Sequence, residues 1–96
     1  MSEFRYAVNV LAKPGILDPQ GRAVELSLPH LNVTNVSMVR VGRRVELTVT
    51  AEAEPQARLV VDGLAKELLS NPLIEVYAFE LLEATSSVVS TGAAPR

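Results

Sequence analysis

The residues able to do chemistry are few and dispersed in this chain of 96 residues. The single histidine, His30, follows a proline, and the sequence suggests no partner for it, whereas a general base needs a hydrogen-bonding partner and a pocket. We interpret His30 as solvated or as capping a helix end. With one histidine and no cysteine, the chain lacks a disulfide framework, a thiolate nucleophile and the ligand spacing of a metal site.

The carboxylates and serines show no catalytic arrangement either. Glutamates are interspersed with basic residues, which is typical of solvated faces. Several serines gather near the C-terminal end, where no rigid element would hold a preorganised nucleophile. The glycines form neither a G-x-G-x-x-G run nor a P-loop. The sequence therefore predicts a chain without catalytic residues, metal or cofactor of its own.

Positive charge is concentrated at Arg40, Arg43 and Arg44. Two interpretations stay open: an exposed turn that discourages edge pairing, or a contact with an anion or a partner, since guanidinium groups bind carboxylate and phosphate in a bidentate manner. The net charge of −2 opposes a nucleic-acid surface, which needs clustered basic charge.

Composition indicates one small domain that associates with other chains. Hydrophobic residues make up 48% of the sequence, yet a domain of this length is only marginally stable alone. No apolar run approaches the roughly 20 residues of a membrane span, and the N-terminal residues do not resemble a secretion signal. We expect a cytoplasmic protein that does not bind membranes.

Periodicity predicts an initial strand and helix. Residues 4–11 alternate as a strand with Phe4, Tyr6, Val8 and Val10 on one face. Pro14 and Gly15 suit a tight turn, Asp18 suits a helix N-cap, and Pro19 suits the first helical position. Residues that recur on one face of the helix are Val24, Leu28 and Leu31. Pro29 predicts an end or kink near Leu28, and Asn32 suits the left-handed position after a helix.

The second half predicts a hairpin, a helix and a strand. Residues 36–41 and 45–51 read as strands around a three-residue loop, with Val41 opposite Val45 and Val39 opposite Leu47. A helix starts at Pro55 and stops before Asn71 and Pro72; its predicted core stripe is Ala57, Val61, Leu64 and Leu68. The last strand, 74–82, places Tyr77, Phe79 and Leu81 on one face and Ile74, Val76 and Ala78 on the other.

The element order β-α-β-β-α-β predicts an α+β, ferredoxin-like fold: a four-stranded antiparallel sheet with two helices on one face. The domain would span residues 1–83, and 84–96 would form a disordered tail. Because the last strand is apolar on both sides, we infer that the helix-free face, or an edge beside it, meets another protein chain.

Two runs of residues resemble one known family, PurS, a subunit of phosphoribosylformylglycinamidine synthase. They are K-P-G-I-L-D-P-Q-G at 13–21 and L-L-S-N-P-L-I-E at 68–75, and the likeness extends over about residues 4–82. The resemblance implies an accessory role in purine synthesis, in which formylglycinamide ribonucleotide, glutamine and ATP give formylglycinamidine ribonucleotide. It also implies a homodimer or homotetramer that bridges a glutaminase subunit and a large synthetase subunit, and that supports ammonia transfer between them. ATP and magnesium are then expected on the synthetase partner.

The resemblance also suggests roles for single residues. Turns and caps are expected at Pro14, Gly15, Asp18, Pro19, Gly21, Gly42, Asn71 and Pro72. Interface positions are expected at Lys13, Arg40, Arg43, Val76, Tyr77 and Phe79. Two alternatives stay open on the fold alone: a small-ligand regulatory module of the amino-acid-sensing type, and a small acylphosphatase-like enzyme, which would need an anion cradle that is not visible around Arg22.

Overall fold

The computed structural model describes residues 1–86; residues 87–96, which include most of the predicted tail, lie outside the described part. Seven elements follow in order: strand β1 (Ser2–Ala12), helix α1 (Pro19–Ser27), a 3-10 turn (Leu28–Leu31), strand β2 (Arg43–Ala51), helix α2 (Glu54–Leu64), a π-helical turn (Ala65–Leu69) and strand β3 (Glu75–Ser86). β3 includes residues 84–86, which the sequence had assigned to the tail.

The sheet of the described residues has three strands in the order β2-β1-β3, and both pairings are antiparallel. The predicted four-stranded sheet is therefore wrong. Residues 36–41 are not a strand, and β2 pairs with β1 rather than with them. The predicted hairpin, with Val41 opposite Val45, does not form. The hairpin does not form because the amides of Val39 and Val41 donate instead to carboxylates at α1. Glu25, on α1, accepts from Val39, and Asp18, just before α1, accepts from Val41.

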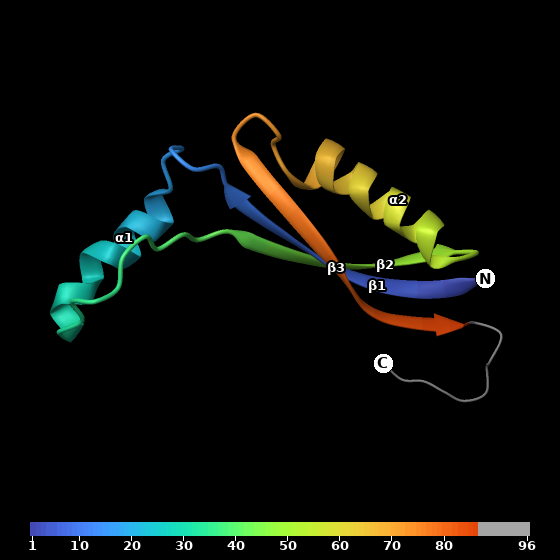
Figure 1. Cartoon of the computed structure of the whole chain (residues 1–96), viewed down its shortest axis with the longest axis horizontal. Helices are drawn as coiled ribbons and strands as arrows, with labels where there is room; N and C mark the ends of the chain where they lie inside the picture. Colours follow the sequence, from blue (N-terminus) through green and yellow to red (C-terminus); the bar gives the residue numbers. More distant parts are fainter. Residues whose placement is uncertain (87–96) are drawn as a thin grey trace.

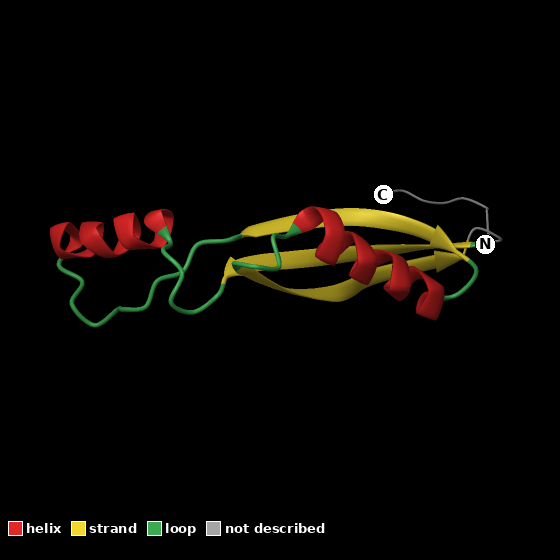
Figure 2. Ribbon diagram, turned by 90° about the horizontal axis from the view of Figure 1, so that it is seen from above, coloured by secondary structure: helices red, strands yellow, loops and turns green. Residues whose placement is uncertain are grey.

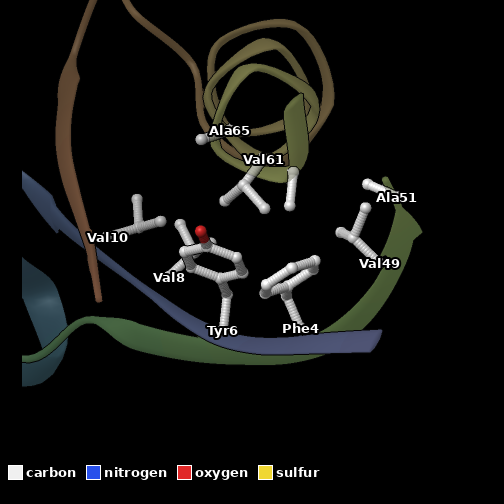
Figure 3. Packing of buried hydrophobic residues seen from close by; sticks show 9 residues of the cluster. Phe4, Tyr6, Val8, Val10, Val49, Ala51, Val61 and Ala65 are labelled. Atoms are coloured by element: carbon white, nitrogen blue, oxygen red, sulfur yellow. The ribbon is translucent and has the colours of Figure 1, made fainter. Parts of the chain in front are cut away.

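The core lies between the sheet and α2. Phe4, Tyr6, Val8 and Val10 alternate along β1 and are buried, as the sequence predicts. Figure 3 shows their side chains pointing toward those of α2 and β2. The buried partners are Val49, Ala51, Ala57, Val61 and Ala65. β1 contributes most because it is the central strand, with a neighbour on each side.

The core stripe of the second helix differs from the prediction. Ala57 and Val61 are buried, but the third buried residue is Ala65, whereas Leu68 is 72% exposed and Leu64 is also exposed. The helix changes from α to π geometry at Ala65. A π turn has more residues per turn than an α turn, so the residues after it rotate relative to the sheet.

The first helix does not cover the sheet. Gly21 is the one buried residue among the nine of α1, and Figures 1 and 2 show α1 beyond the end of the strands, while α2 lies along one face. The expectation of two helices on one face is therefore wrong. The residues from 19 to 41, which comprise α1, the 3-10 turn and an extended segment, project from the sheet and are called the arm.

The arm makes the molecule unusually long. Its radius of gyration is 18.0 Å and its extents are 54 × 31 × 16 Å, whereas a compact domain of about 100 residues has a radius of gyration of about 13 Å. A chain of this size folded onto one core would be more nearly spherical. The structure therefore leaves the surface of the arm without cover from the described residues of the same chain.

Local signals in the arm were predicted well. Asp18 caps α1 by accepting from the amide of Gly21, and Pro19 occupies the first turn. The α-helix ends at Ser27, just before Pro29, and continues as a 3-10 turn. Asn32 closes that turn in the left-handed conformation, with φ of 62°. Each of these features depends on neighbours within a few residues.

The helix-free face of the sheet is mainly charged. Arg5 pairs with Glu46 at 3.0 Å and with Glu83 at 3.3 Å, and Arg44 pairs with Glu46 at 2.9 Å. Leu11, Val76 and Ala78 lie together at one end of this face, and the buried Ala7 lies near its middle. Contact of this face, or of an edge beside it, with another protein chain stays a prediction.

Candidate functional site

The candidate site is the junction where β1 leads into the arm. Lys13, Pro14, Gly15 and Ile16 form a tight turn, closed by the amide of Ile16 donating to the carbonyl of Lys13 at 3.1 Å. Gly15 has φ of +87°, which glycine adopts without strain. The turn lies between β1 and α1, and Lys13 lines the same hollow as residues 38–40.

Asp18 joins two parts of the arm. One carboxylate oxygen accepts from the amide of Gly21 and the other accepts from the amide of Val41, both at 2.9 Å. Hydrogen bonds from these two amides, with the nearby charge of Arg40, hold the pKa of Asp18 below its ordinary value. The cap residue thus also fixes the segment that enters β2.

A second carboxylate continues this attachment. Glu25, on α1, accepts from the amide of Val39 at 2.8 Å. Amides 39 and 41 therefore point toward α1, because alternate residues of an extended segment face the same side. No pattern in the sequence predicts this role of Glu25, since a helical glutamate normally faces solvent.

Two glycines allow the close approach of backbone at the junction. A Cβ on Gly21 would overlap the carbonyl oxygen of Val39, and one on Gly42 would overlap the carbonyl oxygen of Val10. Any larger residue must therefore displace backbone as well as a neighbouring side chain. Both glycines occupy positions where the sequence predicted structural turns, but their physical role is to leave space for a neighbouring segment.

Arg43 and the turn at Asn71 form a separate cluster. Arg43 binds both carboxylate oxygens of Glu75, at 3.0 and 2.9 Å, and the carbonyl of Leu69 at 2.7 Å. The hydrogen bonds from Arg43, and one from the amide of Asn71, lower the pKa of Glu75. The Asn71 side chain accepts from the amide of Leu73 at 3.1 Å, just after Pro72. Arg43 thus has a structural role within its own chain.

Lys13 and Arg40 come together, as neither periodicity nor spacing could show. Both line one surface hollow of about 340 Å³. Its other lining residues are Pro14, Gly15, Ile16, Asp18, Met38 and Val39. The predicted interface residues therefore divide: Lys13 and Arg40 share a surface, while Arg43 lies in the neighbouring ion pair.

The aromatic interface candidates are engaged by their own chain. Tyr77 donates to Asp62 at 2.7 Å, and the ring of Phe79 meets that of Tyr6 edge-on, with centroids 5.9 Å apart. Val76 lies on the opposite face of β3 and is 44% exposed. Contact of these residues with another protein stays a prediction.

One polar contact within the core was missed by the sequence analysis. The hydroxyl of Tyr6 donates to the carboxylate of Glu54 at the start of α2. Burial, and then this hydrogen bond, raise the pKa of Tyr6 to about 12. The guanidinium of Arg58 lies 3.6 Å from the carboxylate of Glu54 and stands over the ring of Phe79, 5.0 Å from its centroid. The alternation in β1 showed that Tyr6 is buried but could not reveal what its hydroxyl contacts.

Within residues 1–86, no three His, Asp or Glu side chains come together as metal ligands. His30 is exposed in the 3-10 turn. No described helix is long and apolar enough to cross a membrane.

The comparisons with known proteins agree with one another. Residues 5–83 match the family model "PurS: Phosphoribosylformylglycinamidine (FGAM) synthase". The chain is 38% identical over 81 residues to the PurS subunit of that synthase from Synechocystis. The aligned residues cover 84% of this chain and 81% of the relative. The chain belongs to the PurS family. The matched range contains most of β1 and β3 and the whole of the other elements.

Solved PurS structures share the fold. The structure of PurLQS from Thermotoga maritima contains a chain with 32% identity and a TM-score of 0.78, over 85% of this chain and 100% of that one. PurS from Methanocaldococcus jannaschii, described as one of the subunits of formylglycinamide ribonucleotide amidotransferase in the purine biosynthetic pathway, has 28% identity and a TM-score of 0.71, over 83% and 96% of the chains. The chain is thus a PurS subunit of phosphoribosylformylglycinamidine synthase, an enzyme of purine biosynthesis.

Proposed function

We propose that this PurS chain is a non-catalytic connector within the synthase. It holds a glutaminase subunit and a large synthetase subunit in a fixed relation, so that ammonia passes between them without loss to water. The observation that carries this proposal is the likeness over the whole length of the PurS-like chain in PurLQS from Thermotoga maritima. ATP and magnesium belong to the synthetase partner, and the complex acts in the cytoplasm.

The shape of the chain supports a connecting role. The arm extends beyond the sheet (Figure 1), and many of its large apolar side chains are exposed. The large apolar residues at or near the arm, all between 41% and 81% exposed, are Leu17, Val24, Leu26, Leu31, Val36 and Met38. Such a concentration of exposed apolar groups is typical of a surface that binds another protein.

A second copy of the chain is the proposed cover for part of this surface. Val24 and Leu31, which the sequence assigned to the buried face of the helix, are exposed here because α1 does not pack on its own sheet. A homodimer or homotetramer would bury that face. Light scattering after size exclusion should give at least twice the mass of 10.3 kDa; a monomer over a wide range of concentrations would contradict this part.

Reconstitution tests the connecting role. The isolated chain should show no turnover, and adding it to the glutaminase and synthetase subunits should restore glutamine-dependent synthesis of formylglycinamidine ribonucleotide. If the two partners reach full glutamine-dependent activity without it, the proposed role is wrong. The regulatory-module alternative has no support, because the relatives reported above all come from the synthase.

A further inference from the structure

The hollow at the junction is lined by two cationic side chains that have no carboxylate within 4.0 Å among the described residues. Each described arginine except Arg40 lies within 4.0 Å of a carboxylate. Among the described lysines and arginines, Lys13, Arg40 and Lys66 have no such partner. Two of these three side chains border the same hollow. An unpaired Lys–Arg pair is therefore localised rather than spread over the surface.

The lining of the hollow adds an apolar component to these charges. Pro14, Ile16, Met38 and Val39 line the hollow together with Lys13 and Arg40, and Met38 is 81% exposed. Asp18 also lines the hollow, which leaves one net positive charge, but both of its oxygens already accept backbone amides. The side-chain hydrogen-bonding groups that remain free in the hollow are thus the donors of Lys13 and Arg40.

The hollow has a fixed frame. The turn at Gly15 and the hydrogen bond from Ile16 to Lys13 define one wall. The attachment of Val41 to Asp18 defines the other. A preformed surface of this kind binds with less loss of conformational entropy than a loop that must be ordered.

We propose that this hollow receives a loop of a partner subunit of the synthase that presents a carboxylate beside an apolar side chain. The carboxylate would lie between the Lys13 ammonium and the Arg40 guanidinium, which matches carboxylate geometry. The apolar side chain would contact Met38 and Ile16. This inference rests on the proposed function, because it requires that the chain binds the partner subunits.

Carboxylate availability favours a different protein over a second copy. Among residues 1–86, arginines, amides or hydroxyls engage eight of the eleven acidic side chains, while Glu3, Glu52 and Glu67 have no such partner there. Glu3 and Glu52 lie at the end of the sheet far from Lys13. A second copy therefore has few free carboxylates to offer, each at an isolated position.

The test is a pair of charge changes in the full chain. Lys13→Glu combined with Arg40→Glu should weaken binding to the partner subunit more than tenfold at low salt, measured by biolayer interferometry. Lys13→Gln combined with Arg40→Gln should weaken it less and should flatten its salt dependence, because the screened charges are gone. Lys66→Glu is the matched control, an unpaired lysine outside the hollow, and should bind like the wild type.

Further measurements separate the possible occupants. Thermal unfolding checks that each variant is folded, with the glutamine variant available if the glutamate variant is not. Unchanged partner binding in both folded variants would overturn the inference while leaving the connecting role intact. A change in the homo-oligomer mass of the variants would show that a second copy occupies the hollow, and this would overturn the inference. Stabilisation by inorganic phosphate of the wild type but not of the variants, with partner binding unchanged, would show a small-anion site and would also overturn the inference. If the wild type binds no partner subunit, the proposed function and this inference both fall.

Discussion

Replacing Tyr6 with phenylalanine tests the polar contact inside the core. The ring of Tyr6 is fully buried, and its hydroxyl donates to Glu54 at the first turn of α2. The substitution keeps the ring and removes the hydroxyl, so packing against Phe79 is retained. The carboxylate of Glu54 then keeps Arg58 as its partner. The measured loss therefore reports the hydrogen bond rather than a cavity.

The size of this loss follows from the hydrogen bond. A hydrogen bond to a charged group contributes about 1.5–3 kcal/mol. We therefore expect Tyr6→Phe to lower the free energy of unfolding by about 2 kcal/mol, which lowers the melting temperature by about 10 °C.

The pH dependence gives an independent check. Because the folded state raises the pKa of Tyr6, its contribution is fully present below pH 10 and is lost as the pH rises through about 12. The difference between wild type and Tyr6→Phe in urea unfolding, followed by circular dichroism at fixed protein concentration, should thus be constant below pH 10 and shrink above it.

A matched variant controls for the loss of a tyrosine hydroxyl in general. Tyr77→Phe removes a hydroxyl that donates to Asp62 near the surface, so its effect should be smaller than that of Tyr6→Phe. Equal stability of Tyr6→Phe and the wild type at pH 7 would refute the reasoning, because a buried hydroxyl bonded to a carboxylate would then contribute nothing.

Three further predictions concern the core and the junction. Val61→Ala should cost about 2–3 kcal/mol in urea unfolding through lost burial and a cavity, whereas Leu59→Ala, at an exposed position, should stay within about 0.5 kcal/mol. Gly42→Ala should lower the melting temperature markedly, because its Cβ would overlap a backbone oxygen of β1; an unchanged melting temperature would contradict that close approach. Because the pKa of Asp18 is lowered, acidification should protonate this carboxylate only below the ordinary carboxylate range. The stability that its hydrogen bond from Val41 contributes is then lost as the pH falls through the lowered pKa. Hydrogen exchange of the Val41 amide should accelerate there; unchanged protection would refute the role of Asp18.

The sequence by itself determined the local elements and the buried face of the sheet. Period-two alternation places Tyr6 and Val8 in the core whatever strand lies beside them. Asp18, Gly15 and Asn32 specify their cap and turns through bonds within a few residues. These features depend on short-range geometry, which residue type and spacing express directly. The resemblance to PurS, supported by the family match over residues 5–83, also came from sequence.

Only the tertiary structure decided where the arm lies and which charges meet. Residues 36–41 have the composition of a strand, but two carboxylates near and on α1 bind the amides of Val39 and Val41 and hold the segment along the helix. Periodicity cannot choose between a sheet edge and a carboxylate as partner for the same amide. The meeting of Lys13 with Arg40 across one hollow follows from that choice, because separation along the chain does not fix distance in space.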